Sequence, residues 1–411
     1  MNRTVLISGV ATGLVVLAAG GGFLLLDENT ADTPTTGTDE DPTAPDAPRV
    51  PDPQPEVDIL AEGFDQPWGL DVLPGADRLL VTERPGALSL VDTASGEVTE
   101  IDGIPEVTAQ GQGGLLDVAV HPDFPESDWI YLTYSAAAQD TDTTTHLARA
   151  RLDPAAAQLV ELEPLFAAEP SLPAHQHYGS TVAFGPDGMV YLTVGDRGDK
   201  NFDDHPAQDT TTTLGTTVRL EPDGSIPEDN PFVGAPGVAD EIYSYGHRNV
   251  QAMAFHPQSG QLWQAEHGEE DGDEINVVQE GGNHGWPEAH TGCEYGTDTP
   301  IGDHPADRED IVDPVHYWEC GSGGFPPSGM TFYQGEEFPS WQGDLLVGTL
   351  AGQYLARFTV DERRVEEADP LLDGEGMRIR NVAVGPSDGV LYVAVDDSDA
   401  PVLRITNAAE Q

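Results

Sequence analysis

Apolar residues in this chain occur in short runs that are separated by clusters of Pro, Gly, Asp and Ser. LLVTE (79–83), WIYLTYS (129–135) and VLYVAV (390–395) are examples, rich in the leucine, β-branched and aromatic residues that are found in strands. From residue 57 onward no stretch of any length repeats its apolar residues with the period of an amphipathic helix. The pattern therefore predicts an all-β protein.

One unit, a turn followed by a short apolar strand, occurs six times. Each unit is too small to bury its own apolar face, so we expect neighbouring units to cover one another in a radial array. The pattern predicts a six-bladed β-propeller. The widest gaps, Asp196–Tyr243 and Glu266–Phe332, are expected to be long connections on one face, where a propeller carries its site. The six turns are 73–77, 121–124, 185–188, 256–260, 338–343 and 385–389.

The repeat within residues 175–199 differs from the others. Its turn GPDG (185–188) and its strand are ordinary, but a histidine cluster precedes it and the pair Asp196 and Arg197 follows it. Side chains that flank such a hairpin can project into a cleft. Imidazole titrates close enough to neutrality to serve as a base, so we place the candidate chemistry at His177. His175 is expected to face solvent or a neighbouring side chain.

The N-terminal segment predicts export from the cytoplasm. Thr4 to Leu26 is an uncharged, mainly apolar run behind Arg3, long enough to cross about 30 Å of hydrocarbon. Residues 1–26 are therefore expected to be a signal peptide or a membrane anchor. Residues 27–57 are rich in Thr, Pro and Asp and are expected to form a disordered linker. The folded domain is expected at 58–408, either secreted or tethered to the cell surface.

The net charge of the chain is extreme. Lys and Arg number 17 and Asp and Glu number 73, which gives 17 − 73 = −56, and Lys200 is the single lysine. Nucleic acid and anionic membrane surfaces are poor partners, because their phosphates would be repelled. Self-repulsion of this size needs screening, and the Debye length falls to about 3 Å in 1 M salt. We interpret the composition as adaptation to high salt; the alternative is an acidic secreted enzyme from an ordinary environment.

Cys293 and Cys320 are the two cysteines of the chain. In an exported protein such a pair favours a disulfide over two free thiols. A disulfide here would close a loop over the face to which we assign the site. Two cysteines cannot complete a structural zinc site by themselves, and no histidine spacing supplies the missing ligands.

A series of motifs extends along most of the chain. In chain order the motifs are GQGGLL (111–116), HPDF (121–124), HYGSTVAFGPDG (177–188), YGHRN (245–249), EHG (266–268), GDEIN (272–276), GNHGWP (282–287) and RIR (378–380). The series resembles that of the soluble quinoprotein glucose/sorbosone dehydrogenases, and within them the aldose sugar dehydrogenases, from about residue 63 to 405. The resemblance implies a six-bladed propeller that binds pyrroloquinoline quinone (PQQ) and calcium.

The resemblance also implies a reaction. A sugar hemiacetal would be oxidised at C1 to a lactone, with a base for the hydroxyl proton and a calcium-bound quinone for the hydride. An external electron acceptor would then reoxidise the cofactor. His177 matches the catalytic base, and Arg248 is expected beside it as a second catalytic residue.

Cofactor and metal positions follow from the same motifs. Arginine forks suit the three carboxylates of the quinone, and calcium prefers oxygen ligands. The expected cofactor-binding residues are Gln112, Arg248, Asn249, Arg378 and Arg380. The expected metal-binding residues are Gly268 and Glu269, through main-chain oxygens, and Asp273 in the same loop.

The chain departs from the family at three positions. Thr181 stands where relatives usually have an arginine, Ala351 where the glucose enzymes have a lysine on the cofactor, and Gln176 in place of an acidic residue. Fewer cofactor contacts predict a lower affinity for the quinone. Two alternative functions remain open at this point: a non-catalytic surface-binding propeller, and a calcium-dependent lactonase, which would need carboxylates around the metal but no arginine cluster.

Overall fold

The structure is a computed structural model that describes residues 53–75, 77–139, 141–386 and 388–408. The expected signal peptide or anchor at 1–26 lies outside these residues, as does the expected linker up to residue 52. Strand β1 (Pro55–Phe64) begins before the expected domain boundary at residue 58. Within the described ranges, no helix has the length and apolarity needed to span a bilayer.

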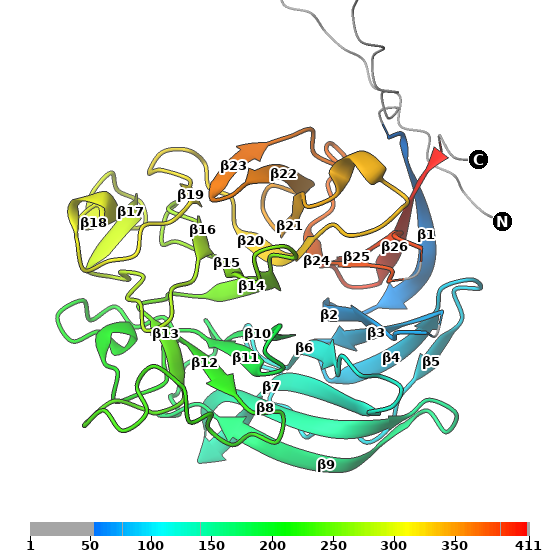
Figure 1. Ribbon diagram of the computed structural model, residues 1–411, viewed down its shortest axis with the longest axis horizontal. Coiled ribbons are helices and arrows are strands. Elements are labelled where there is room, and N and C mark those ends of the chain that lie inside the picture. The colour runs from blue at the N-terminus through cyan, green and yellow to red at the C-terminus, as the bar shows by residue number, and fades with distance from the viewer. Residues whose placement is uncertain (1–52, 76, 140, 387, 409–411) are drawn as a thin grey trace, which may run out of the picture.

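Six four-stranded antiparallel sheets are arranged around a central axis, so the predicted six-bladed β-propeller is confirmed (Figure 1). Blade 1 contains β2 (Pro67–Val72), β3 (Arg78–Glu83), β4 (Ala87–Asp92) and β5 (Val98–Glu100). Blade 2 contains β6 (Leu115–Val120), β7 (Trp129–Gln139), β8 (Asp142–Asp153) and β9 (Gln158–Ala167). Blade 3 contains β10 (Gly179–Phe184), β11 (Val190–Val194), β12 (Thr216–Leu220) and β13 (Ile242–Tyr245).

The remaining blades follow the same plan. Blade 4 contains β14 (Val250–Phe255), β15 (Leu262–Glu266), β16 (Glu274–Val277) and β19 (His316–Tyr317). Blade 5 contains β20 (Pro327–Phe332), β21 (Leu345–Thr349), β22 (Leu355–Asp361) and β23 (Arg364–Glu367). Blade 6 contains β24 (Ile379–Val384), β25 (Leu391–Val395), β26 (Ala400–Asn407) and β1. A hairpin of β17 (Ala289–Cys293) and β18 (Pro300–Gly302) lies outside the blades, as do the short 3-10 turns 206–208, 305–307 and 339–341.

The N-terminal strand closes the ring. β1 pairs antiparallel with β26, with Ile59 opposite Leu403, so blade 6 is built from both ends of the domain. The first strands of the six blades (β2, β6, β10, β14, β20 and β24) contact one another in sequence around the axis, and β24 returns to β2. The ring of blades is therefore closed, and the strand edges that remain unpaired are those of the outer strands of the blades.

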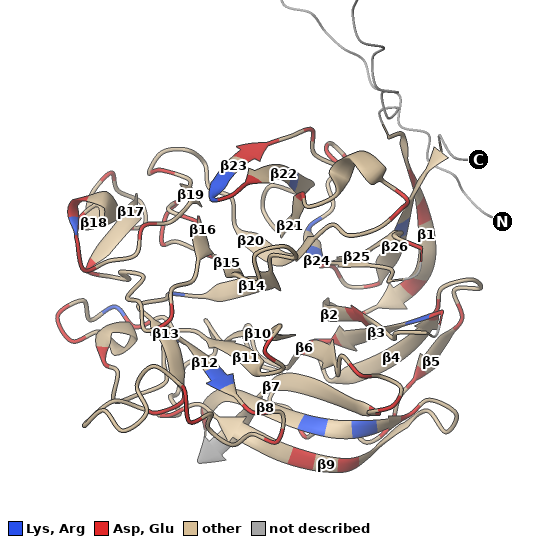
Figure 2. Ribbon diagram, in the orientation of Figure 1, with Lys and Arg blue, Asp and Glu red and all other residues tan. Residues whose placement is uncertain are grey.

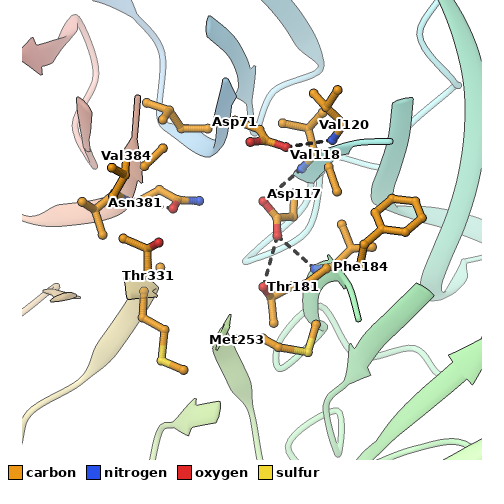
Figure 3. A pocket seen from close by; sticks show the side chains of 18 residues that line it. Asp71, Asp117, Val118, Val120, Thr181, Phe184, Met253, Thr331, Asn381 and Val384 are labelled. Carbon is orange, nitrogen blue, oxygen red and sulfur yellow. Dashed lines mark hydrogen bonds between the residues drawn. The ribbon is translucent and has the colours of Figure 1, made fainter. Parts of the chain in front are cut away.

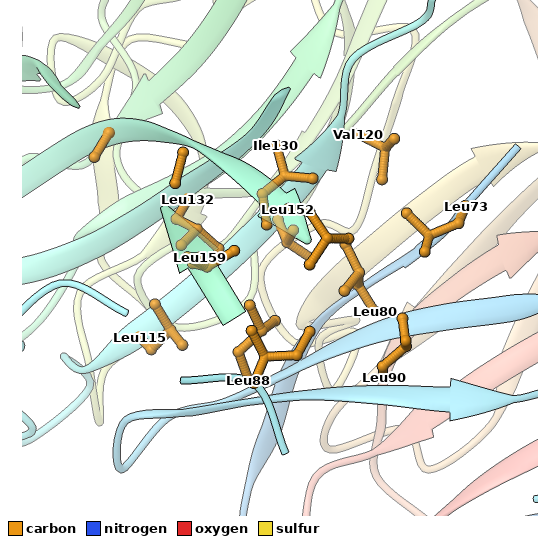
Figure 4. Packing of buried hydrophobic residues seen from close by; sticks show 14 of the residues in the cluster. Leu73, Leu80, Leu88, Leu90, Leu115, Val120, Ile130, Leu132, Leu152 and Leu159 are labelled. Atoms are coloured by element: carbon orange, nitrogen blue, oxygen red, sulfur yellow. The ribbon is translucent and has the colours of Figure 1, made fainter. Parts of the chain in front are cut away.

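Packing between blades explains why the strands are apolar on consecutive residues. In β3, Leu79 and Val81 pack toward blade 6, whereas Leu80 between them packs toward blade 2. All three are fully buried. Figure 4 shows Leu80 among side chains of blade 2, including Ile130 and Leu132. Burial of a leucine in this way contributes about 1.5–3 kcal/mol, so packing between blades stabilises the ring.

The six turns of the sequence repeat all join the first and second strands of a blade. At the other end of the first strand, every blade has a register shift in the pairing with its second strand. We call this end the site face. β-Bulges bend a strand and redirect its side chains, and they are common beside active sites. The residues that precede the first strands and those that follow the second strands therefore meet at the site face.

One expectation about the long connections is wrong. The gap 196–243 is not a single connection, because β12 lies inside it. Since β12 is antiparallel to both neighbours, the segment 195–215 lies at the site face and the segment 221–241 at the opposite face. The gap Glu266–Phe332 likewise contains β16, β19 and the β17–β18 hairpin.

Cys293 and Cys320 form the expected disulfide, with their Cα atoms 5.5 Å apart. It links β17 to the segment that leads into β20. Cys293 also forms a β-bridge with Glu270, in the connection after β15. The disulfide therefore holds the loop that contains the expected metal-binding residues.

Candidate active site

His177 and Asp196 form a hydrogen-bonded pair at the site face. His177 precedes β10 and Asp196 follows β11, so the hairpin of blade 3 brings them together. The distance from Nδ1 of His177 to Oδ1 of Asp196 is 2.7 Å. Because a carboxylate can only accept, Nδ1 carries the proton and Nε2 keeps a free lone pair. The imidazole is 11% exposed, so it is buried but remains accessible from one side.

Asp196 is completely buried and fully hydrogen-bonded. The backbone N–H of Gly198 donates to Oδ1 (2.7 Å), and the indole Nε1–H of Trp286 donates to Oδ2 (2.8 Å). Burial by itself would raise the pKa of Asp196. Hydrogen bonds from His177 and His205, together with the positive charge of Arg248, outweigh burial and hold this pKa far below its ordinary value. Asp196 is therefore a permanent anion beneath the imidazole.

The backbone around His177 is closely enclosed. His177 itself has φ +50°, in the left-handed region, and its N–H donates to Oε1 of Gln112 (2.7 Å). A Cβ on Gly195 would lie 2.1 Å from the carbonyl oxygen of His177, and one on Gly111 would lie 2.3 Å from that of His175. These glycines are needed because the segment 175–177 passes directly against them. Gln112, which the sequence predicts to bind the cofactor, thus holds the backbone of the catalytic segment through its side-chain oxygen.

A pocket of about 440 Å³ opens beside this segment. It brings together three of the expected cofactor-binding residues, Gln112, Arg378 and Arg380. Two further residues, Arg84 and His267, contribute a third guanidinium and an imidazole. The other residues that line the pocket are Gln66, Trp68, Gln251, Leu350, Asp396, Asp397 and Ser398.

The pocket contains three guanidinium groups, and among the described residues one carboxylate, that of Asp396, pairs with them. Arg378 and Arg380 share one partner, Oδ2 of Asp396, at 2.8 and 3.0 Å. Arg84 donates to neutral groups, the Gly111 carbonyl and Gln66. The buried Nε of Arg380 has no hydrogen-bond partner among the described residues. Figure 2 shows how sparse Lys and Arg are among the acidic residues of the molecule, so this local excess of positive charge is unusual here.

His267 stays neutral within this group of cations. Its Nε2–H donates to the carbonyl of Pro327 (2.6 Å). Burial, and the nearby charges of Arg248 and Arg380, lower the pKa of His267 to about 3. The imidazole therefore supplies polarity to the pocket without adding charge at neutral pH.

Arg248 lies behind the pocket and is nearly inaccessible. Nη2 pairs with Oε2 of Glu269 (2.9 Å), and Nη1 donates to the His267 carbonyl (3.3 Å). Its guanidinium carbon is 5.2 Å from the centre of the Trp286 ring. Lys200 pairs with the other carboxylate oxygen of Glu269. The buried Nε of Arg248 has no partner in the described part of the chain.

Asn249 has a supporting position. Its Oδ1 accepts a hydrogen bond from the N–H of Gly179 (3.2 Å), and its side chain is buried. It therefore links the start of β14 to the start of β10, two residues after His177. Asn249 does not line the pocket that holds Arg378 and Arg380.

The expected metal loop uses its side chains internally. Asp273 accepts from the N–H groups of Gly268 (3.0 Å) and Phe325 (2.6 Å), one on each carboxylate oxygen. Glu269 is occupied by its two cations. No described residues form a cluster of three or more His, Cys, Asp or Glu side chains suited to a metal ion. The carbonyl oxygens of Gly268 and Glu269, however, accept no hydrogen bond from any described residue, which fits main-chain oxygens that a cation would use.

A second cavity, of about 290 Å³, lies in the central channel between the first strands (Figure 3). Its charged residues are Asp71 and Asp117. Both carboxylate oxygens of Asp117 accept hydrogen bonds. Oδ1 accepts from the N–H of Val118 (3.0 Å), and Oδ2 accepts from the hydroxyl of Thr181 (3.1 Å) and the N–H of Val182 (3.0 Å). Thr181, the first of the three departures noted in the sequence, thus faces the channel. Ala351, the second departure, is exposed.

The sequence missed four important residues of the site: Arg84, Asp196, His267 and Trp286. Asp196 follows the predicted hairpin, but the sequence alone does not pair it with His177. Trp286 and His267 fall within motifs of the resemblance, but their partners come from other blades. Arg84 follows β3 in blade 1 and had no motif to indicate it.

Comparison with known proteins gives one consistent result. Residues 64–404 match the family model described as glucose/sorbosone dehydrogenase. Aldose sugar dehydrogenase YliI of Escherichia coli is 37% identical over 354 residues, which cover 85% of this chain and 92% of that protein. The crystal structure of the soluble E. coli aldose sugar dehydrogenase in its apo form superposes with a TM-score of 0.80 at 36% identity, covering 86% of this chain and all of the other. The PQQ-bound aldose sugar dehydrogenase of Streptomyces coelicolor gives 0.68 at 30% identity, covering 87% and 99%.

Proposed function

The chain belongs to the glucose/sorbosone dehydrogenase family, and on that premise we propose that it oxidises aldose sugars at C1 to lactones with PQQ as its cofactor. The observation that carries the proposal is the juxtaposition of two features at the site face. One is a histidine with a free Nε2, held by a buried aspartate. The other is a pocket with unpaired guanidinium N–H groups beside it.

His177 is the general base of the proposed reaction. Its Nε2 takes the proton of the C1 hydroxyl while the hydride leaves C1. The imidazolium that forms is stabilised by the permanent negative charge of Asp196, which also fixes the tautomer. Arg248, whose guanidinium lies against Trp286 and whose buried Nε–H has no partner among the described residues, would add a polar N–H group beside this pair.

The residues present fit PQQ. Arg378, Arg380 and Arg84 would bind its carboxylates, and the orphaned Nε of Arg380 is a donor already desolvated for that purpose. Gln112 would add a polar contact at the edge shared with His177. Bound PQQ would supply the acceptor for the hydride. In a chain of net charge −56 such a pocket has little use except to hold an anion.

Calcium is proposed on the main chain of the loop after β15. The unused carbonyl oxygens of Gly268 and Glu269 would bind it, as oxygen ligands suit this ion. Asp273, expected from the sequence as a ligand, is proposed to act by holding the loop, because both of its oxygens bind backbone N–H groups. The ion would add positive charge where the cofactor binds.

Calorimetric titration of PQQ into the protein tests this site. We expect binding with calcium, weaker binding with chelator, and weaker binding still in Arg378→Ala/Arg380→Ala, at about 1.5–3 kcal/mol for each charged hydrogen bond lost. Arg364→Ala, an exposed arginine of β23, is the matched control. Equal binding in all samples would place the cofactor elsewhere, and no binding with calcium present would favour a non-catalytic binding propeller.

The remaining features of the function are proposals from the sequence. Export by the N-terminal segment would place the enzyme outside the cytoplasm, secreted or tethered by residues 1–26. An external electron acceptor would reoxidise the cofactor. Nucleic acid is expected to be a poor partner, because the charge of the chain repels its phosphates. Washing of membranes distinguishes the two forms. The tethered form should need detergent for its release, whereas salt alone should release the secreted form.

A further inference from the structure

We propose that Arg197 is a positioning residue for His177, which it holds through the peptide bond between Gln176 and His177. The proposal rests on the proposed function, in which His177 is the base. Arg197 follows Asp196 directly, so the two adjacent residues would hold the catalytic histidine at two points. Asp196 binds the imidazole ring, and Arg197 binds the backbone that carries it.

The guanidinium of Arg197 donates to three carbonyl groups. Nε–H donates to Gln176 (2.9 Å), Nη1 donates to Thr143 (3.2 Å), and Nη2 donates to Ala174. Two of these carbonyls lie in the segment before β10, and Thr143 lies at the start of β8 in blade 2. The planar fork therefore fixes the catalytic segment against a neighbouring blade, in a geometry that lysine cannot reproduce.

The peptide bond before His177 is held from both ends. Its carbonyl, on Gln176, accepts from Arg197, and its N–H, on His177, donates to Gln112 (2.7 Å). His177 needs this support because its φ is +50°, and Arg197 itself has φ +62°. Residues other than glycine are strained in this region and adopt it only where the surroundings determine it. The conformation that points the imidazole at Asp196 is thus imposed by its neighbours.

Arg197 is also an unusual buried charge. It is 2% exposed, its guanidinium carbon is 3.7 Å from the centre of the Tyr178 ring, and no carboxylate of the described residues forms an ion pair with it. Burial lowers its pKa from the ordinary value for arginine. Buried charges in proteins are usually paired with an opposite charge. Arg219, in the same blade but near the opposite face, is such a case, bound to Asp187 and Asp229.

Substitution of Arg197 by lysine tests the proposal with PQQ and calcium bound. We expect Arg197→Lys to lower kcat about 10- to 100-fold, as misplacement of a catalytic group by about 1 Å can cost 10². Binding of PQQ, measured calorimetrically, should stay within threefold of wild type. Arg219→Lys is the matched control and should lower the melting temperature without changing kcat.

Two further measurements separate positioning from stability. The Nδ1 proton of His177, hydrogen-bonded to Asp196, should give a downfield proton NMR signal that is absent in His177→Gln and weakened or shifted in Arg197→Lys, whether or not the protein turns over a sugar. Added methylguanidinium should restore part of kcat in Arg197→Ala. An unchanged signal and an unchanged kcat in Arg197→Lys would overturn the proposal. An inactive wild type with the signal intact would instead defeat the proposed function.

Discussion

Trp286 donates a hydrogen bond from its indole nitrogen to Oδ2 of Asp196, although 90 residues separate them in the chain. The same indole lies against the guanidinium of Arg248. Trp286 therefore connects the histidine–aspartate pair of blade 3 to the arginine that precedes blade 4. Arg248 in turn donates to the carbonyl of His267, which lines the proposed cofactor pocket. The proposed base and the proposed pocket are therefore connected at the site face.

Replacing Asp196 by asparagine should inactivate the enzyme without unfolding it. The amide fills the same space but can donate to Nδ1 of His177, so the proton of the ring moves to Nε2 and the base is lost. We expect kcat to fall about 10²- to 10⁴-fold, the usual contribution of a general base. Steady-state kinetics measures this, with PQQ binding checked separately.

Asp187→Asn is the matched control for this variant, because Asp187 lies in the turn at the opposite end of the same hairpin. It should leave kcat unchanged. A kcat within twofold of wild type in Asp196→Asn would remove the carboxylate from the mechanism.

The central channel predicts how stability depends on pH. Burial is the main cause that raises the pKa of Asp117 to about 7 and that of Asp71 to about 6. The folded protein therefore holds these protons more tightly than the unfolded chain, whose aspartates titrate near about 3.9. The contribution of the pair to stability falls as the pH rises from about 4 to about 7.

Asp117→Asn should reduce this loss. Its melting temperature should decline less between pH 5 and pH 8 than that of wild type, at roughly 2–4 °C for each kcal/mol. Asp77→Asn, at an exposed position, should follow wild type. Parallel curves for Asp117→Asn and wild type would show that the channel carboxyls do not titrate in this range.

Salt should stabilise the fold strongly. The Debye length shortens from about 10 Å at 0.1 M to about 3 Å at 1 M, so repulsion among the surface carboxylates is screened. We expect the melting temperature to rise steeply between dilute buffer and molar salt. Scanning calorimetry in sodium chloride from 0.1 to 2 M checks this, and the same midpoint at both ends would refute adaptation to high salt.

The fold could be predicted from the sequence because its signal is local. Each turn and the strand after it lie within a dozen or so residues, and the same unit recurs around the ring. The third strands have no such marker. The sequence therefore does not reveal β12, and the pattern predicts one long connection where this strand lies.

The site was predictable only in part, for a physical reason. His177, Gln112, Arg378 and Arg380 precede or begin first strands, where motifs identify them. Their carboxylate partners follow second strands, as Asp196 and Asp396 do, and the hairpin of each blade brings them into contact. Trp286, in the connection after β16, reaches Asp196 only when blades 3 and 4 pack together. Burial of charge is likewise invisible in the sequence.

The loop after β15 illustrates the same limit. The family resemblance predicts a metal site in this loop, and Asp273 is expected to be a ligand because it lies in the same loop. In the structure the carboxylate of Asp273 is turned inward, onto the N–H groups of Gly268 and Phe325. Whether an acidic side chain faces a ligand or its own loop depends on the backbone path, which the composition does not specify.

The most direct test of the account is an anaerobic absorption titration of protein reconstituted with PQQ and calcium. Addition of an aldose should convert the spectrum of the bound oxidised quinone to that of the reduced form in wild type, with one sugar consumed per site. His177→Gln should bind PQQ equally well but show this conversion at least about 10²-fold more slowly. An unchanged spectrum in wild type with every aldose tried, or equal rates in wild type and His177→Gln, would contradict the account.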